Sequence, residues 1–156
     1  MKLVLASTSA YRRELLTRFG LPFEIARPDI DESPQPDEAP RATAERLAIE
    51  KAKAVAAQFS DALIIGSDQV ASMGSQRFGK PGTVDRAAAQ LRSMSGQTVI
   101  FDTALALINT RSGRIQVEVI PTEVRFRALS DDEIVRYVER ERPLDCAGSA
   151  KSEGLG

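Results

Sequence analysis

Asp68 and Lys80 are two residues of opposite charge that stand beside glycines and could carry out chemistry on a bound ligand. Asp68 follows the apolar run 63–65 and two small residues, which predicts that the chain leaves a buried strand and turns where the carboxylate faces a ligand. Lys80 lies in a second predicted turn, 79–82, whose glycines let the backbone approach a bulky group. The alternative is that Asp68 caps a turn and Lys80 is solvated.

Ser7 and Arg12 stand where the sequence predicts a strand followed by a helix. Residues 3–6 form a short apolar run, and the hydroxyl residues 7–9 supply an N-cap for a helix that ends at Gly20. The N–H groups and hydroxyls at such a helix start suit phosphate oxygens. Arg12 shares the inward stripe of Leu15, Leu16 and Phe19, so we expect its guanidinium to meet an anion unless its stem only crosses apolar surface.

Lys51 lies inside the apolar stripe of the helix predicted over residues 40–59. It follows Leu47 by four residues and Ala48 by three, whereas Lys53 faces away. We therefore expect Lys51 to reach an interior anion, with an outward-reaching ammonium as the alternative.

The segment 28–40 is predicted to be a loop because it contains four prolines. It also carries five carboxylates, which usually mark a solvated surface. A hard cation such as Mg²⁺ could use acids of this density together with Asp68 and substrate phosphates, and Glu32 is our candidate for that role.

The remaining pattern alternates strands and helices. We expect strands over residues 23–26, 98–109 and 115–127, with a hairpin-like link at 110–113. Helices are predicted over 83–94, with Thr83 as N-cap, and after the capping sequence that begins at Ser130. This composition of elements indicates an α/β fold.

Composition restricts the chemistry. The 156 residues are 42% hydrophobic with a net charge of −1, which indicates a globular domain without a general basic field for nucleic acid. The absence of histidine excludes Ser-His-Asp and Cys-His catalysis, so catalysis must use carboxylates, lysine or arginine. The single cysteine, Cys146, fits a reducing compartment and is interpreted as inert. No apolar run approaches the roughly 20 residues of a membrane span, and we expect a cytoplasmic protein.

Six short motifs occur in order along the chain: 5–16 (LASTSAYRRELL), 31–32 (DE), 50–52 (EKA), 66–70 (GSDQV), 79–81 (GKP) and 147–149 (AGS). Together they resemble the Maf family of nucleoside triphosphate pyrophosphatases, and the likeness covers nearly the whole chain. The resemblance implies a Maf/ITPase-like mixed β-sheet flanked by helices, with a central cleft and often a dimeric state. It also implies cleavage between the α- and β-phosphates of a nucleotide with a divalent metal, Mg or Mn, which yields the monophosphate and pyrophosphate.

The resemblance also implies roles for individual residues. Asp68 is similar to the family's proton acceptor, Glu32 and Asp68 to metal-site carboxylates, and the phosphate-binding set comprises Ser7, Arg12, Lys51 and Lys80, with both lysines counted as catalytic. Phosphoryl chemistry requires such groups, because charge grows on the leaving pyrophosphate. An ordinary aspartate pKa near 4 is low for a base, so either burial raises it or Asp68 orients water already acidified by the metal, and we favour the second.

Tyr11, Gln69 and Glu153 stand at three positions that distinguish branches of this family. The branch acting on thymidine and uridine triphosphates resembles Arg, Thr and Gln there, whereas this set is similar to the branch acting on 7-methyl-GTP. Methylation at N7 leaves a positive charge on the purine, which the Tyr11 face would attract while the Glu153 carboxylate meets the guanine N–H edge. The alternative is a core tyrosine and a surface acid.

We expect a single Maf-like domain over residues 1–156, which lacks the further C-terminal strand and helix that the family resemblance implies. Two other functions remain open: a pyrophosphatase for dTTP or UTP, and a non-catalytic nucleotide-binding module that regulates cell division. No nucleic-acid or membrane partner is expected, and a homodimer is possible under the resemblance.

Overall fold

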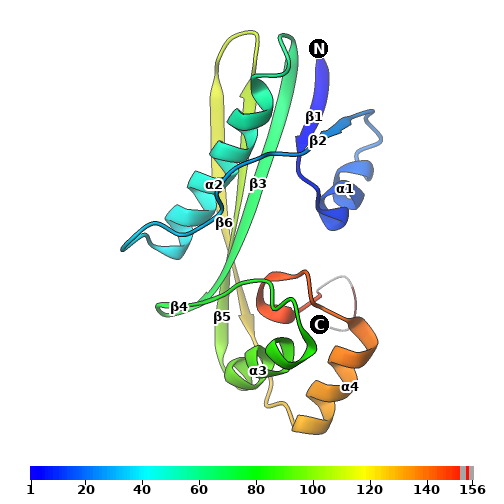
Figure 1. Ribbon diagram of the computed structural model, residues 1–156, viewed down its shortest axis with the longest axis vertical. Coiled ribbons are helices and arrows are strands. Elements are labelled where there is room, and N and C mark those ends of the chain that lie inside the picture. Colours follow the sequence, from blue (N-terminus) through cyan, green and yellow to red (C-terminus); the bar gives the residue numbers. More distant parts are fainter. Residues whose placement is uncertain (152–153, 155–156) are drawn as a thin grey trace. The chain divides into compact units, whose positions relative to one another are not determined.

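The computed structural model describes residues 1–151 and 154, in two compact units (Figure 1). One unit comprises Met1–Asp68 and Thr103–Ile120, and the other comprises Gln69–Asp102 and Pro121–Gly156. In chain order the elements are β1 (Lys2–Ala6), α1 (Ala10–Thr17), β2 (Glu24–Ala26), α2 (Pro40–Ala56), β3 (Ala62–Met73), β4 (Gln76–Phe78), α3 (Val84–Met94), β5 (Thr98–Asn109), β6 (Ile115–Arg125), α4 (Asp131–Glu141) and the 3₁₀ turn η1 (Ala147–Ser149).

The strands form a mixed sheet in the order β2-β1-β3-β5-β6, with β4 paired to β3. Strand β1 runs parallel to both of its neighbours, so that Val4 pairs with Glu24 on β2 and with Ile64 on β3. Strand β4 pairs with β3 in the antiparallel sense, with Ala71 opposite Phe78. Parallel and antiparallel pairs in one sheet with accompanying helices confirm the mixed α/β fold.

In the first unit, α2 packs its small apolar residues against β3. The buried residues of α2 recur at helical spacing, as the sequence predicted, and are Thr43, Ala44, Leu47, Ala48, Lys51, Ala52 and Val55. Gly66 of β3 makes this packing possible, because a Cβ atom there would lie 2.2 Å from the carbonyl oxygen of Ala48 and 2.7 Å from the amide nitrogen of Ala52. Helix and strand therefore approach at backbone distance.

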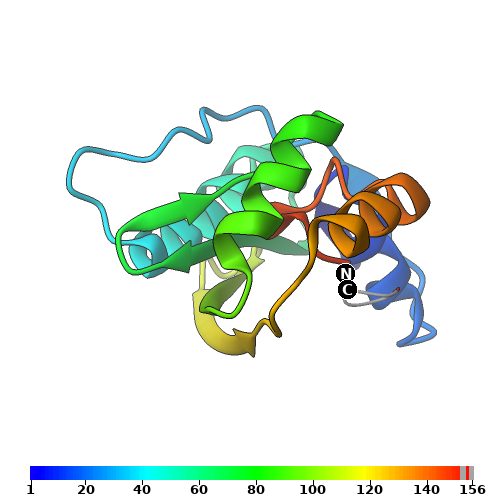
Figure 2. The same cartoon turned by 90° about the horizontal axis from the view of Figure 1, so that it is seen from below.

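In the second unit, α3 and α4 lie side by side (Figures 1 and 2). Both helices begin as predicted: the Thr83 side chain accepts a hydrogen bond from the Arg86 amide, and Ser130 and Glu133 form a reciprocal capping box. Residues of both helices form an apolar core together with Phe101 of β5, and the helical members include Ala88, Leu91, Met94, Ile134 and Val138. Among the described residues, no helix has the length and apolar character needed to cross a membrane.

Two sequence predictions about local structure are wrong. The chain does not turn after residue 65, because β3 continues without interruption to Met73 and carries Asp68 within the strand. The small residue Gly66 serves the close approach of α2 instead of a turn. The apolar stripe of α1 is also narrower than predicted: Leu15 is 47% exposed and Phe19 is 75% exposed.

Several boundaries also differ from the predictions. Strand β2 begins at Glu24, α2 ends at Ala56, and β6 ends at Arg125. On α1, Arg12 and Leu16 are half-buried one helical turn apart, so the inward row passes through these two residues.

Candidate active site

The start of α1 gathers hydroxyl groups at the end of β1. Ser9 is the N-cap of the helix, and its side chain accepts a hydrogen bond from the Arg12 amide over 3.4 Å. The Ser9 amide in turn donates to Oγ of the buried Ser7 over 3.1 Å. A cavity of about 270 Å³ opens here and is lined by Ser7, Thr8, Ser9, Ala10, Arg13 and Ile25. Hydroxyls, a helix N-terminus and a guanidinium make this cavity suitable for an anion.

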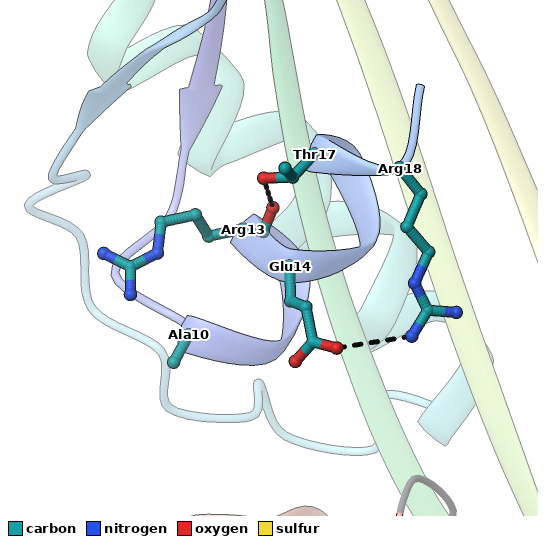
Figure 3. A pocket seen from close by; sticks show the side chains of 5 residues that line it. All are labelled: Ala10, Arg13, Glu14, Thr17 and Arg18. Carbon is teal, nitrogen blue, oxygen red and sulfur yellow. Dashed lines mark hydrogen bonds and ion pairs between the residues drawn. The ribbon is translucent and has the colours of Figure 1, made fainter. Parts of the chain in front are cut away.

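Arg13 is a residue that the sequence reasoning missed. It lines the hydroxyl cavity and also a second cavity of about 500 Å³ on the outer side of α1, together with Ala10, Glu14, Thr17 and Arg18. Figure 3 shows Arg13 and Arg18 projecting to opposite sides of the helix, with Arg18 paired to Glu14. The signal was available in the sequence, because Arg13 comes one turn after the N-cap of a helix that begins with hydroxyl residues.

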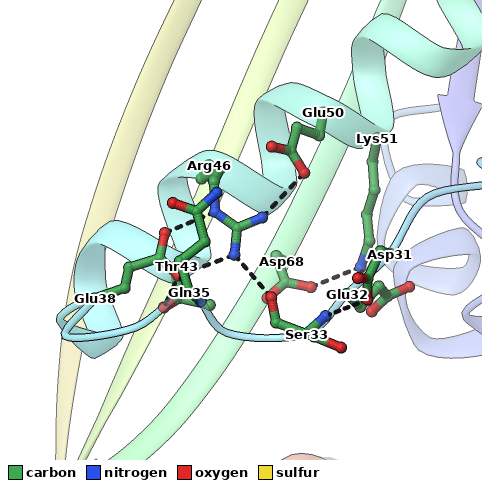
Figure 4. Close-up of polar contacts among 10 residues, drawn as sticks. All are labelled: Asp31, Glu32, Ser33, Gln35, Glu38, Thr43, Arg46, Glu50, Lys51 and Asp68. Carbon is green, nitrogen blue, oxygen red and sulfur yellow. Dashed lines mark hydrogen bonds and ion pairs between the residues drawn. The ribbon is translucent and has the colours of Figure 1, made fainter.

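Lys51 joins two carboxylates that come from distant parts of the chain. Its ammonium nitrogen lies 2.6 Å from Oδ1 of Asp68 and 2.9 Å from Oε2 of Glu32 (Figure 4). The side chains of Lys51 and Asp68 are only 7% and 10% exposed, whereas that of Glu32 is 56% exposed. The structure thus brings together the predicted interior lysine, the β3 aspartate and the acidic loop; we call these three residues the Lys51 cluster.

The position of this cluster follows from local sequence. Side chains alternate along a strand, so Ile64, Gly66 and Asp68 share one face of β3. Gly66 faces Ala48 and Ala52 of α2, and Lys51 follows Ala48 by three residues on the same side of that helix. The missing Cβ of Gly66 therefore brings α2 close enough for Lys51 to reach Asp68.

Burial and neighbouring charges compete at Asp68. Burial, the largest influence, raises the pKa of the Asp68 carboxyl, while Lys51 and Arg12 act in the lowering direction and the Glu32 charge adds to the rise. Burial likewise lowers the pKa of Arg12, and the charges of Asp68 and Glu32 oppose this change. Arg12 thus shares the electrostatic environment of the Lys51 cluster, and Asp68 holds a proton more readily than an ordinary aspartate.

The structure does not place the other predicted site residues in the Lys51 cluster. Tyr11 is half-buried beside Arg12 in α1, and Gln69 is exposed immediately after Asp68. Lys80 is exposed in the irregular segment after β4, where the predicted turn over 79–82 is not formed, and this segment belongs to the second unit together with Gln69. Gln90 donates to the Gly79 carbonyl in this segment over 3.1 Å. Glu153 lies outside the described residues.

Glu32 and Asp68 suit a divalent cation whose coordination is completed by oxygens of a bound ligand. Among the described residues, no group of three or more His, Cys, Asp and Glu side chains is arranged to hold a metal ion. Glu32 and Asp68 nevertheless contact the same cationic nitrogen from two sides. Two carboxylates are the usual protein contribution to a Mg²⁺ ion that also binds substrate phosphates. The donor set therefore fits a nucleotide-associated divalent cation.

The fold and this site define a class: a mixed α/β protein with hydroxyls, arginines, a buried lysine and paired carboxylates gathered in one unit, which suits a phosphorylated ligand. The chain matches the family described as Maf-like protein over residues 2–156, and it belongs to that family.

Similar proteins from several bacteria carry one name. The chain is 67% identical to a protein of Aromatoleum aromaticum named 7-methyl-GTP pyrophosphatase, over 99% of this chain and 80% of that protein. It is 59% identical to a protein of Polaromonas sp. with the same name, over 99% of this chain and 70% of that protein. For a protein of Pseudomonas aeruginosa with this name, the identity is 56% over 99% of this chain and 80% of that protein.

Proposed function

We propose that this chain hydrolyses 7-methyl-GTP to 7-methyl-GMP and pyrophosphate. The observation that carries the proposal is the Lys51 cluster, in which a buried lysine contacts a buried and an exposed carboxylate. The names of the similar proteins support the substrate and the reaction. Membership of the Maf family supports the same class of chemistry.

Asp68 is the proposed proton acceptor. A water molecule attacks phosphorus, the bond to the departing pyrophosphate oxygen breaks, and the carboxylate of Asp68 orients the water and receives its proton. The raised pKa of Asp68 brings its basicity closer to the neutral range than that of an exposed aspartate. Burial, the route that we did not favour from the sequence, therefore raises the basicity of Asp68, and the metal-acidified water remains a proposal.

The cations stabilise the charge of the triphosphate. An ammonium has three N–H donors, and two of those on Lys51 are engaged by Glu32 and Asp68, which leaves one for a phosphate oxygen. Arg12 and Lys80 are proposed to contact phosphate oxygens as well, and Ser7 to donate its hydroxyl hydrogen to one of them.

A divalent cation, Mg²⁺ or Mn²⁺, would be held by Glu32 and Asp68, where it would neutralise phosphate charge and make water more acidic. The exposure of Glu32, at 56% of its side chain, leaves that carboxylate accessible to a cation that arrives with a nucleotide. The Asp68 carboxylate would provide the anchored half of the site.

Selectivity for the methylated base is proposed to come from Tyr11, Gln69 and Glu153. The N7-methylated purine is a cation, which an aromatic face and a carboxylate both attract. Replacing Glu153 by Gln would remove the charge but keep the shape. We expect Glu153→Gln to reduce the preference for 7-methyl-GTP over GTP, and an unchanged ratio of kcat/KM values for the two would contradict this assignment.

The proposal also covers the cellular location and the oligomeric state of the enzyme. A cytoplasmic location is supported by the single cysteine, which fits a reducing compartment. A homodimer is proposed from the Maf family resemblance alone.

The test is pyrophosphate release from a panel of triphosphates with Mg²⁺. We expect the highest kcat/KM for 7-methyl-GTP, with lower values for GTP, dTTP and UTP. A preference for dTTP or UTP would favour the pyrimidine alternative. Nucleotide binding without pyrophosphate release would favour a regulatory module instead.

A further inference from the structure

Arg46 fastens the acidic loop between β2 and α2 to the helix that carries Lys51. Its guanidinium donates from Nε to Oε1 of Glu38 over 2.6 Å and from Nη2 to Oε2 of Glu38 over 2.9 Å. It also donates from Nη1 to Glu50 over 3.0 Å and from Nη2 to the carbonyl oxygen of Ser33 over 3.1 Å (Figure 4). We call Arg46, Glu38, Glu50 and Ser33 the Arg46 cluster.

This contact is built into the loop and is more than a surface ion pair. The side chains of Arg46 and Glu38 are only 18% and 9% exposed. Glu38 accepts two further hydrogen bonds, from the Thr43 hydroxyl over 2.8 Å and from the Gln35 amide over 3.1 Å. The Arg46 guanidinium, as the largest influence, lowers the pKa of Glu38 to about 2. The carboxylate is therefore ionised and fully engaged near neutral pH.

Glu32 belongs to this loop, and its carboxylate contacts Lys51. It lies in an irregular segment, and its side chain is 56% exposed, so the local backbone supplies little regular hydrogen bonding to orient it. Ser33, the next residue, gives its carbonyl to Arg46, while its amide donates to Oδ1 of Asp31 over 2.9 Å. The peptide units that follow Glu32 are thus fixed to α2, the same helix that presents Lys51.

We infer that Arg46 is a positioning residue, which holds the acidic loop so that Glu32 stays beside Lys51 and Asp68. The inference rests on the proposed function in so far as Glu32 serves a divalent cation there. Arginine is required because a planar fork can bind both oxygens of Glu38, Glu50 and a carbonyl at once, whereas the single ammonium of lysine cannot. Groups that orient metal ligands typically change metal affinity or activity by about 10- to 100-fold when they are removed.

The test compares Arg46→Gln with a matched control, Arg92→Gln. Arg92 also pairs with an acid on another element, Asp131, but both side chains are more than half exposed and lie in the other unit. Amide hydrogen exchange across residues 31–38 reports on the loop without any need for catalysis. We expect Arg46→Gln to increase exchange there at least about tenfold and Arg92→Gln to leave it unchanged.

The link to Glu32 is tested by the Mg²⁺ concentration that gives half-maximal turnover of 7-methyl-GTP. We expect Arg46→Gln to raise it about tenfold with a smaller change in kcat, and Arg46→Lys to recover only part of the loss. In a Glu32→Gln background, the Arg46 substitution should add no further increase, because the carboxylate that it positions is gone.

The outcomes separate this inference from the proposed function. Unchanged exchange in Arg46→Gln overturns the inference, as does faster exchange with an unchanged Mg²⁺ requirement, or an equal increase with and without Glu32. If the unmodified chain releases no pyrophosphate, the proposed function fails, and hydrogen exchange alone then decides whether Arg46 holds the loop.

Discussion

Helix α2 carries two cations that each contact two carboxylates, yet the two arrangements differ in kind. Lys51 is 7% exposed and contacts Asp68 and Glu32 through a single nitrogen. Arg46, five residues earlier and 18% exposed, spreads three nitrogens over Glu38, Glu50 and the Ser33 carbonyl. Lys51 makes its contacts through one buried ammonium nitrogen. Arg46 makes its contacts through three nitrogens of a planar guanidinium, and two of its partners belong to the loop before α2.

This difference indicates that the two clusters have different roles. A point charge between two carboxylates can exchange partners with a phosphate or a cation, since it fixes little geometry of its own. A fork with several simultaneous hydrogen bonds fixes the backbone that it touches. The Lys51 cluster is therefore suited to chemistry, and the Arg46 cluster is suited to holding a loop in place.

Gly66→Ala should disturb both clusters at once and gives the largest expected effect. The new Cβ would meet backbone atoms of Ala48 and Ala52 that cannot move independently of α2. We expect a loss of more than about 3 kcal/mol in the free energy of unfolding, measured by urea denaturation. Gly74→Ala is a useful comparison, because nothing lies near its Cβ position and only its φ of 58° opposes the change. An equal loss for both variants would show that helix–strand proximity is not the cause.

Lys51→Met should affect stability more than any single change in the Arg46 cluster. Removing the ammonium leaves the buried Asp68 carboxylate without its nearest cation, which costs about 3 kcal/mol at pH 7. Adding Asp68→Asn to this variant should restore much of the loss, because no buried charge remains. A double variant as unstable as the single one would contradict this explanation.

The same variant should show a defined pH dependence. The pKa of Asp68 is already raised by burial, and loss of Lys51 removes a lowering influence. Protonation of a carboxyl with a raised folded-state pKa stabilises the folded state, fully below the unfolded pKa near 4, and this gain disappears as pH rises through the folded pKa. The stability gap between Lys51→Met and the unmodified chain should therefore be smaller near pH 4.5 than at pH 7 in urea denaturation.

Titration of Glu38 gives the smallest effect and isolates the Arg46 cluster. The pKa of Glu38 is lowered to about 2, so its contribution to stability is present above the unfolded pKa near 4.3 and is lost as pH falls towards 2. Carboxyl NMR signals should report a higher Glu38 pKa in Arg46→Gln, because the largest lowering influence is removed while the hydrogen bonds from Gln35 and Thr43 remain. Glu133 is an internal control, because hydrogen bonds from Ser130 in its capping box, as the first cause, lower its pKa to about 2. A parallel shift at Glu133 would contradict a local effect.

Much of this architecture could be predicted from local pattern. The caps at Ser9, Thr83 and Ser130 and the buried position of Lys51 follow from spacing and side-chain chemistry. The role of Gly66 could not be predicted, because a glycine before a polar residue suits a turn as well as a close approach of a helix. The difference depends on which element packs opposite, which is a tertiary property.

The Arg46 cluster was missed for a related reason. Its partners Glu38 and Ser33 lie in a proline-rich acidic loop, and the sequence of such a loop is typical of a solvated surface. Only the folded conformation of the loop brings these residues into contact with Arg46 of α2. Arg13 could not be predicted from the apolar stripe of α1, because that stripe contains its neighbour Arg12 and leaves Arg13 on the exposed side. The functional roles of all the site residues remain predictions, which applies to Ser7, Tyr11, Arg12, Glu32, Lys51, Asp68, Gln69, Lys80 and Glu153.

The measurement that tests the central claim most directly is product analysis of 7-methyl-GTP hydrolysis with Mg²⁺, for the unmodified chain and for Asp68→Asn. The account predicts equal amounts of 7-methyl-GMP and pyrophosphate, with turnover lowered about a hundredfold or more in the variant and circular dichroism unchanged. Release of inorganic phosphate with a diphosphate product, or a variant that turns over at the unmodified rate, would contradict it.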